Sequence, residues 1–369
     1  MFLLALKNLF SEKSRLSICV GGVAFSVLLI LILRGLYFGF DQRITRYLES
    51  ISADLWIVQD GSGDMFHSVS LLPNEYKEKL SQIEEIESAE RFLGRQMIFD
   101  WKDERVTTFI VGVDFEKNIA GPIKVVEGKE KPDSHEIIID RVLSKNKKIH
   151  LGDSLNIANH NFKIVGISEG GNLLLYQYSF ILQKDAEEIF EMKNLTNRFI
   201  VKVKNQDETD KVMQKIENNL PRTKAFKKSE FIKQNRKTVT ESFLPIVSVI
   251  VLIGFLIGLI VIGLTIFNAT IEKSRELGVL KALGASNFNL YTLVFWQALF
   301  FSILGFLVGL ALTFAIQPVI LYFTPSFLSY FRLEDFVLVF ALSILMAISA
   351  SWIPLKRLSK IDPALVFKA

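Results

Sequence analysis

The side chains that could carry catalysis or bind a metal do not occur in the spacings that these activities use. The sequence contains no His-Glu-x-x-His, no two histidines four residues apart and no Gly-x-Ser-x-Gly, so it predicts neither a metal site nor a serine hydrolase. Gly128-Lys129 lacks the earlier glycine and the following serine or threonine of a nucleotide-binding loop. Cys19, the single cysteine, lies in an apolar run and is interpreted as a packing residue. We therefore predict a chain without catalytic activity or a cofactor of its own; its histidines are His67, His135, His150 and His160.

A charged segment from Glu272 to Ser286 lies between two apolar runs. Leu277, Leu280 and Leu283 recur at a spacing of three, which is typical of one face of a helix. Gly284 follows the last of these leucines, where a helix often ends. The segment is predicted to be a short amphipathic helix that could receive force from a partner. Its polar side is formed by Glu272, Lys273, Arg275, Glu276 and Lys281.

Four stretches are apolar enough to cross a membrane. Half of the residues are hydrophobic and the mean hydropathy is +0.32, which is too high for an ordinary soluble protein. A span needs about 20 apolar residues. Gln317-Pro318 and Thr324-Pro325-Ser326 are predicted to break the second half of the third run. The sequence therefore predicts transmembrane helices at 16–38, 243–268, 288–316 and 335–354.

The distribution of lysine and arginine predicts the orientation of these spans. The net charge of +4 is mild, and its basic residues cluster next to the spans, which indicates membrane topology and not a nucleic-acid partner. Under the positive-inside rule both termini are cytoplasmic. The predicted cytoplasmic parts are an amphipathic helix at 1–15, the charged segment within 269–287 and a tail at 355–369. The parts outside the cytoplasm are then a domain at 39–241 and a loop at 317–334.

Apart from Arg34, the predicted spans carry no ionisable side chain near the membrane midplane, which argues against a proton- or ion-coupled carrier. Arg34 lies near the outer end of the first span, where its side chain can reach the interface. An outer-leaflet contact of Arg34 with lipid or substrate is the alternative. Small-residue spacings in two spans leave packing within one chain and contact with a second chain both open. They are formed by Gly254, Gly258, Gly263, Gly305 and Gly309.

The domain between the first two spans mixes strand and helix patterns. Two βαβ-like portions are predicted at about 50–115 and 196–227, with a β-rich insertion at about 116–190. A helix is expected from Pro73 to Ile83, because proline is tolerated in the first turn of a helix. Polar helical stalks at 39–52 and 227–241 lead into this domain. The predicted fold class is an α-helical membrane protein with an α+β domain outside the cytoplasm.

Three stretches carry patterns that occur together in one family. Residues 272–286 fit a charged Glu-x-x-x-Glu-Leu-Gly pattern that ends in Ala-Leu-Gly-Ala, and the tail combines basic residues with Asp362-Pro363. Residues 150–155 and 162–167 are similar to an inserted β subdomain. With the order of one span, a domain and three spans, the chain resembles the MacB/FtsX-type (type VII) ABC transporter permeases. This family includes macrolide-efflux, lipoprotein-releasing and haem-efflux permeases.

The resemblance implies a mechanical function. Two permease chains, identical or paralogous, would pair, and each would dock its charged segment on an ABC ATPase subunit that binds ATP and Mg²⁺. The stalks would relay the ATP-driven motion to the outer domain. The residues that the resemblance assigns to ATPase coupling are Glu272, Arg275, Glu276, Leu277, Gly278, Leu280, Lys281, Leu283 and Gly284.

The resemblance further implies a bacterial inner-membrane protein that exports or extracts an amphipathic or membrane-embedded substrate. A membrane-fusion or adaptor protein is one further partner that it leaves open, and the bilayer itself is another. The alternative function is a transmembrane signalling or scaffold protein that activates an extracytoplasmic partner, such as a cell-wall hydrolase, without transport.

Overall fold

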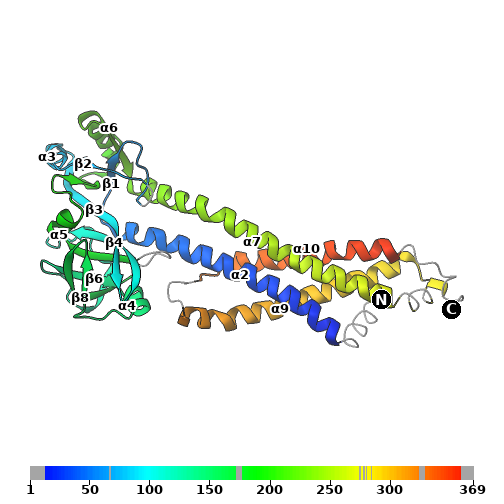
Figure 1. Cartoon of the computed structure of the whole chain (residues 1–369). Coiled ribbons are helices and arrows are strands. Elements are labelled where there is room, and N and C mark those ends of the chain that lie inside the picture. The colour runs from blue at the N-terminus through cyan, green and yellow to red at the C-terminus, as the bar shows by residue number, and fades with distance from the viewer. Residues whose placement is uncertain are drawn as a thin grey trace. The chain divides into compact units, whose positions relative to one another are not determined.

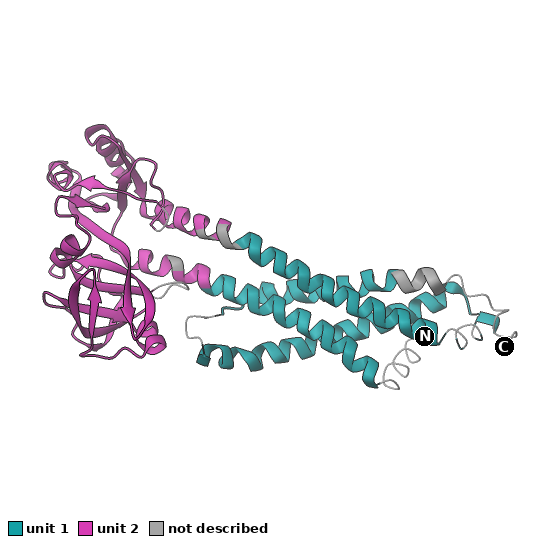
Figure 2. Ribbon diagram, in the orientation of Figure 1, with its two compact units in different colours: residues 1–39, 243–323, 328–369 teal, residues 40–242, 324–327 magenta. Residues whose placement is uncertain are grey.

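The computed structural model describes residues 13–65, 68–171, 177–273, 276, 279, 281–283, 285–323 and 329–358. The chain forms two compact units, which Figure 2 colours separately. Unit 1 contains residues 1–39, 243–323 and 328–369, and unit 2 contains residues 40–242 and 324–327. Most of the helix predicted at 1–15, and the tail beyond Leu358, lie outside the described residues.

Unit 1 is built from apolar helices (Figure 1). Among the described residues, four helices are long and apolar enough to cross a membrane, which agrees with the four predicted spans. Their apolar parts fall within Lys13–Ser50, Leu244–Glu272, Asn287–Phe323 and Leu333–Trp352. The helices themselves are α2 (Lys13–Ser50), α7 (Lys228–Glu272), α9 (Asn287–Phe323) and α10 (Leu333–Leu358).

Two of these helices are far longer than one span. A span needs about 20 residues, whereas α2 has 38 and α7 has 45. The residues of α2 after Gly39 belong to unit 2, and so do the residues of α7 before Phe243. The stalk segments predicted from the sequence are therefore the ends of the same helices that carry the apolar spans.

The third apolar helix is longer than the sequence predicts. The expected break at Gln317-Pro318 is wrong, because α9 continues to Phe323 with Pro318 inside it. Pro318 removes one backbone donor, but an apolar helix tolerates such a residue where local adjustments satisfy the freed carbonyl. Its position near the end of α9 leaves few further turns to disturb. The described residues between α9 and α10 that lie outside both helices are 329–332.

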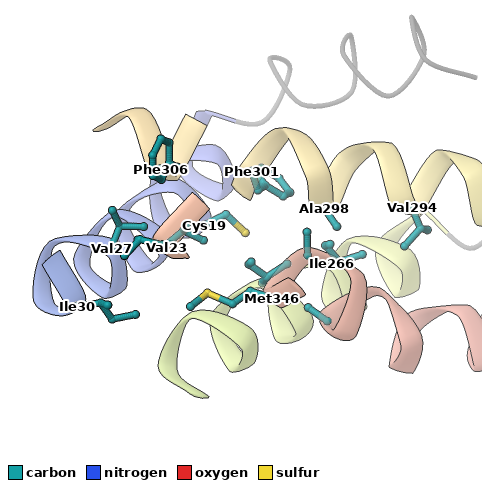
Figure 3. Packing of buried hydrophobic residues seen from close by; sticks show 14 of the residues in the cluster. Cys19, Val23, Val27, Ile30, Ile266, Val294, Ala298, Phe301, Phe306 and Met346 are labelled. Carbon is teal, nitrogen blue, oxygen red and sulfur yellow. The ribbon is translucent and has the colours of Figure 1, made fainter. Parts of the chain in front are cut away.

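The core of unit 1 is formed where α2 meets the other three helices (Figure 3). Cys19 is fully buried in this cluster, as expected for a packing residue. Gly305 and Gly309 on α9 allow the close approach to α2. A Cβ at Gly305 would lie 2.4 Å from the Cβ of Val23, and one at Gly309 would lie 2.7 Å from the carbonyl oxygen of Ala24. These two glycines therefore serve packing within the chain.

Unit 2 contains a split βαβ arrangement that joins segments far apart in the sequence. The strand order β12-β1-β11-β3 is antiparallel throughout, so each βαβ portion inserts a strand between two strands of the other. Both predicted portions are thus confirmed. The elements are β1 (Leu55–Gln59), α3 (Tyr76–Ser81), β3 (Ile86–Trp101), β11 (Arg198–Val203), η1 (Gln206–Glu208), α6 (Thr209–Asn219) and β12 (Thr223–Lys227).

The predicted β-rich insertion extends the same sheet from β3. Its order β3-β4-β9-β6-β8-β5 contains parallel β4–β9 and β6–β8 pairs, so the sheet is mixed. A separate core of aliphatic and aromatic side chains lies inside it. The elements are β4 (Glu104–Val113), β5 (Lys124–Gly128), β6 (Glu136–Asp140), α4 (Arg141–Lys147), β7 (Ser154–Ile157), β8 (His160–Glu169), β9 (Gln177–Leu182) and α5 (Gln183–Ile189).

The helix predicted from Pro73 to Ile83 begins later than expected. Pro73 belongs to β2 (Leu72–Pro73), which pairs with β10 (Leu195–Thr196), and α3 begins only at Tyr76. Proline is compatible with a short edge strand because its missing N–H is not needed on the open side. The tolerance of proline in the first turn of a helix therefore led to the wrong start for this helix.

Candidate functional site

The charged segment begins with a residue that is paired to the first helix. Glu272 is the last residue of α7, and its carboxylate accepts a hydrogen bond from the guanidinium of Arg15 near the start of α2. The Glu272 side chain is 65% exposed and the Arg15 side chain 16%. A carboxylate at a helix C-terminus opposes the helix dipole, and the nearby guanidinium offsets this effect. Glu272 therefore also links two helices of unit 1.

The described part of the segment presents an exposed face. Residues 276, 279, 281 and 282 are helical, and the amide of Leu283 donates to the carbonyl of Val279 over 2.9 Å. Glu276 is exposed, and the relative exposures of Val279 and Leu283 are 42% and 80%. The spacing 276, 279, 283 places these side chains on one side of a helix.

The other predicted coupling residues divide into two groups. Lys281 is described and is half-buried. The rest lie outside the described residues, and their predicted roles remain predictions. They are Arg275, Leu277, Gly278, Leu280 and Gly284.

Ser286 ends the segment as the N-cap of α9. Its hydroxyl accepts from the amide of Asn289 over 3.3 Å, and its carbonyl accepts from the amide of Leu290 over 3.3 Å. The next aromatic residue, Phe288, is 75% exposed. The helix start is thus fixed by local bonds, while an apolar side chain beside it stays accessible.

Arg34, the predicted lipid or substrate contact, has a protein partner in unit 1. Its Nε donates to Oδ1 of Asp335 over 2.7 Å, and the two side chains are 26% and 0% exposed. The other oxygen of Asp335 accepts from the amide of Arg332 over 3.0 Å, as in half of a capping box at the start of α10. The guanidinium carbon of Arg332 lies 3.5 Å from the centroid of the Phe38 ring. This arrangement ties α2 to the start of α10, and the lipid or substrate contact of Arg34 stays a prediction.

Within unit 2, the ends of α2 and α7 are joined by charged groups. Arg236 of α7 pairs with Asp41 of α2 over 3.1 Å. The ammonium of Lys228 donates to the carbonyls of Glu49 and Ile51, over 2.7 Å in each case. The ends of α2 and α7 are therefore connected to each other by side-chain pairs and by bonds from a side chain to the backbone.

Aromatic side chains pack the same helix ends against the sheet of unit 2. Phe231 of α7 stacks on Trp56 of β1 with ring centroids 4.7 Å apart. Tyr47 of α2 lies 4.2 Å from Tyr178 of β9, and its hydroxyl donates to the carbonyl of Ala120 over 2.6 Å. Tyr47, Trp56 and Phe231 are fully buried. Movement of either helix end would therefore have to displace buried groups of the sheet.

Two buried charges in unit 2 have perturbed pKa values. Burial raises the pKa of Asp140 to about 6, although a hydrogen bond from the amide of Val142 and the positive charge of Arg43 lower it. Burial likewise lowers the pKa of Arg198 to about 10. The Arg198 guanidinium donates to the backbone carbonyl of Asp64 over 2.7 Å. Both groups face protein partners, which is typical of structural charges.

Among the described residues, one group of side chains could hold a metal ion. His135, His160 and Glu188 each place a ligand atom within 4.8 Å of those of the other two. Sequence spacing did not predict this group, because its members belong to different elements.

Three residues in the charged segment and at the helix contacts were also missed by sequence reasoning. Arg15 is one of the basic residues beside the first predicted span, and the 257 positions between it and Glu272 hide the pairing. Val279 lies between the predicted leucines but is exposed. Asp335 carries the one signal that could have been used, since it is an acidic residue in the first turn of a predicted helix and at the same predicted membrane level as Arg34.

Comparison with known families gives two matches that together cover most of the chain. Residues 16–219, more than half of the chain, match the MacB-like periplasmic core domain. Residues 248–363 match the FtsX-like permease C-terminal domain. The first match ends with α6, and the second begins inside α7.

Individual relatives are distant in sequence. A protein of Staphylococcus haemolyticus named as the hemin transport system permease HrtB is 23% identical over 339 residues, which cover 91% of this chain and 90% of that protein. The macrolide export ATP-binding/permease protein MacB of Agrobacterium fabrum is 24% identical over 135 residues, or 37% of this chain and 21% of MacB.

Two solved structures are also similar to parts of the chain. The extracellular domain of the ABC-type transporter YknZ aligns over 47% of this chain and 100% of that domain, with 10% identity and a TM-score of 0.37. The periplasmic region of MacB from Actinobacillus actinomycetemcomitans aligns over 52% of this chain and 97% of that region, with 12% identity and a TM-score of 0.38.

Proposed function

The chain belongs to the MacB/FtsX-type ABC transporter permeases, and on this premise we propose that it transmits the motion of a partner ATPase to unit 2. The ATPase subunit binds and hydrolyses ATP with Mg²⁺, and the permease contributes no catalytic group. The permease lies in the bacterial inner membrane with both termini in the cytoplasm and unit 2 on the other side. Positive charge beside the predicted cytoplasmic ends supports this orientation.

The observation that carries the proposal is the continuity of α2 and α7. Each is a single helix whose apolar part lies in unit 1 and whose other end is packed among buried groups of unit 2. Pro245 lies inside α7 and removes one backbone hydrogen bond, but the helix continues through it to Glu272. A continuous helix resists bending, because backbone hydrogen bonds hold its turns. A displacement applied at one end of such a helix is therefore delivered to the groups at its other end.

The proposed input is the segment from Glu272 to Ser286. The exposed side chains of Glu276, Val279 and Leu283 support a docking face that combines one charge with apolar area. The Arg15–Glu272 pair links this input to the start of α2, and its exposed carboxylate can be exchanged for a group of the docked ATPase. The other predicted coupling residues complete the face in this proposal.

A second permease chain, identical or paralogous, completes the proposed assembly. α7 carries an exposed apolar row at a spacing of four residues, which suits either lipid or a facing helix of a second chain. The row is formed by Leu252, Leu256, Ile260 and Leu264. A membrane-fusion protein remains a further candidate partner.

The proposed cargo is an amphipathic or membrane-embedded molecule. The names of two relatives support this class, since one refers to hemin transport and the other to macrolide export. The apolar helices carry no described ionisable group other than those at their ends, apart from the paired Arg34 and Asp335, which suits a mechanism without a charged channel.

The test uses the full chain co-expressed with each candidate ABC ATPase subunit of its own organism. Glu276→Lys and Leu283→Asp place unfavourable charge in the proposed docking face. Loss of a hot-spot residue at the centre of an interface costs about 2 kcal/mol or more, which is roughly a 30-fold loss of association. We expect each variant to lose ATPase co-purification and permease-stimulated ATP hydrolysis. The matched control is Val69→Asp, because Val69 is equally apolar and 77% exposed but lies in unit 2.

The proposal fails if both variants retain wild-type association and stimulation, or if Val69→Asp impairs them equally. Reconstituted vesicles then separate transport from signalling. Release of an amphipathic fluorescent probe that depends on ATP and is lost in Leu283→Asp would support transport. Normal coupling without movement of any such probe would favour the signalling or scaffold alternative.

A further inference from the structure

Three potential metal ligands of unit 2 converge from separate elements of the β-rich insertion. His135 lies in the turn before β6, His160 is the first residue of β8, and Glu188 lies on α5. One ligand atom from each lies within 4.8 Å of those of the other two. His135 and Glu188 are exposed and His160 is half-buried, so an ion can reach the group from solvent.

Backbone geometry fixes His160 at this position. The β7–β8 hairpin turns through Ala158 and Asn159, whose φ angles are +50° and +64°. Two consecutive left-handed residues are typical of the tight two-residue turn that suits a hairpin. His160 then pairs with Ile157 across the turn. The position of its backbone therefore follows from a short and well-defined loop.

Asp185 positions both the backbone and the ring of His135. Its carboxylate accepts from the amide of His135 over 2.8 Å and from the hydroxyl of Ser134 over 2.9 Å. Asp185 is only 3% exposed. It lies three residues before Glu188 on α5, so one face of this helix supplies both the support and a ligand.

The same hydrogen bonds select one tautomer of His135. The hydroxyl of Ser134 lies 3.0 Å from Nδ1 of His135, and its single proton is directed to Asp185. The hydroxyl must therefore accept the Nδ1 proton of His135, which leaves the lone pair of Nε2 available. Phe162, which is buried, stacks against the same ring at a centroid distance of 5.8 Å. A carboxylate that orients a histidine in this way is typical of the groups that support metal ligands.

We propose that Nε2 of His135, a ring nitrogen of His160 and a carboxylate oxygen of Glu188 bind a zinc-class divalent cation. Two imidazoles and one carboxylate are a ligand set that zinc uses with a fourth position left open to water or another ligand. Neighbouring ligand atoms of a tetrahedral zinc lie about 3.3 Å apart, so the present group closes by small rotations of exposed side chains. Binding would cross-link the turn before β6, the β7–β8 hairpin and α5. The site is independent of the ATPase-coupling proposal.

The test is calorimetric titration of Zn²⁺ into the full chain in detergent, purified without a histidine tag. We expect one ion per chain in the wild type. His135→Ala and His160→Ala should weaken binding by more than about 100-fold, because changes in supporting groups alone cost roughly 10- to 100-fold. His150→Ala is the matched control, since it removes an exposed histidine of the same insertion that is not part of the group. It should leave the affinity unchanged.

Ser134→Ala tests the supporting hydrogen bond while keeping all three ligands. We expect a loss of affinity of about tenfold or more, with an altered visible spectrum of the Co²⁺-substituted protein. Circular dichroism without metal verifies that each variant folds. The proposal is overturned if the wild type binds no stoichiometric ion, if His160→Ala binds as tightly as the wild type, or if His150→Ala loses affinity equally.

Discussion

The two long helices make contacts of different kinds at their two ends. In unit 1, the start of α2 and the end of α7 are linked by Arg15 and Glu272, and the Glu272 side chain is largely exposed. In unit 2, the opposite ends of the same helices are linked by charges and also packed by the fully buried Tyr47 and Phe231. The helix ends in unit 2 are thus held by buried contacts within the chain. The helix ends in unit 1 keep charged and apolar groups accessible.

The two ends of these helices differ in how readily a partner could bind to them. Buried aromatic contacts stabilise a unique arrangement because their removal leaves a cavity. An exposed ion pair contributes little to stability and is easily exchanged for other partners. The exposed end therefore suits reversible docking, and the packed end suits transmission. Substitutions at the packed end should therefore change stability more than substitutions at the exposed end.

The largest expected difference is between two phenylalanines. Phe231→Ala removes a fully buried ring that stacks on Trp56, and we expect the free energy of unfolding to fall by about 4 kcal/mol. Phe288→Ala removes a ring that is 75% exposed in unit 1, and the change should stay below about 0.5 kcal/mol. Denaturant unfolding of both full-length variants in detergent measures the contrast. Equal losses would show that the two regions are packed alike.

The next largest effect is expected at the contact between α2 and α10. Asp335→Leu leaves Arg34 without its carboxylate partner and removes the acceptor for the amide of Arg332. Breaking a buried ion pair costs about 3–5 kcal/mol of stability. For Asp335→Leu we expect the free energy of unfolding to fall by the lower limit of this range, because the Arg34 side chain is 26% exposed.

The double variant Arg34→Leu/Asp335→Leu is the control for this second prediction. It removes both charges and should recover part of the loss, because no uncompensated charge remains. The measurement is the unfolding midpoint of the wild type, of Asp335→Leu and of the double variant. If Asp335→Leu alone is neutral, then this contact is as weak as an exposed pair and the proposed contrast is lost.

Asp140 extends the comparison through the pH dependence of stability. Its pKa is about 6 in the folded protein, above the ordinary value of 3.8, mainly because the carboxyl is buried. A raised pKa in an acid means that its contribution to stability is complete below about pH 4 and is lost as the pH rises through about 6. The wild type should lose about 2 kcal/mol of stability from this group between pH 4 and pH 7.

Asp140→Asn removes this titration while keeping a side chain that can cap α4. The difference in unfolding free energy between wild type and variant should therefore change with pH, and the variant should be the more stable protein at pH 7. Arg43 and Glu169 also act on Asp140, and both residues are present in the wild type and in the variant. A pH-independent difference would contradict the burial argument.

Several features of this fold could be predicted because they depend on local pattern. Apolar runs predicted the four long helices, and strand patterns predicted the β-rich insertion. β3 was missed, because its first half pairs with β11 and its second half with β4. The two halves therefore face different cores, so no single alternation of apolar and polar residues runs through the strand.

The candidate site likewise contains features that the local sequence predicts and contacts that it does not. Charge and spacing along the chain were sufficient to single out residues 272–286, since the relevant pattern is continuous. The pairing of Arg34 with Asp335 joins residues 301 positions apart, and the group at His135 joins three elements. Such contacts depend on tertiary packing, and no periodicity in one sequence encodes them.

The smallest effect is expected for the ion pair at the exposed end. Arg15→Gln and Glu272→Gln should each change the free energy of unfolding by less than about 1 kcal/mol, because solvent screens a pair whose carboxylate is 65% exposed. A double-mutant cycle should give a coupling energy of about 0.5 kcal/mol or less, and 1 M NaCl should abolish it. A coupling energy above about 2 kcal/mol that resists salt would mean that this end is fixed internally. The exposed segment would then have to move as one body with α2, and docking could no longer rely on exchange of this pair.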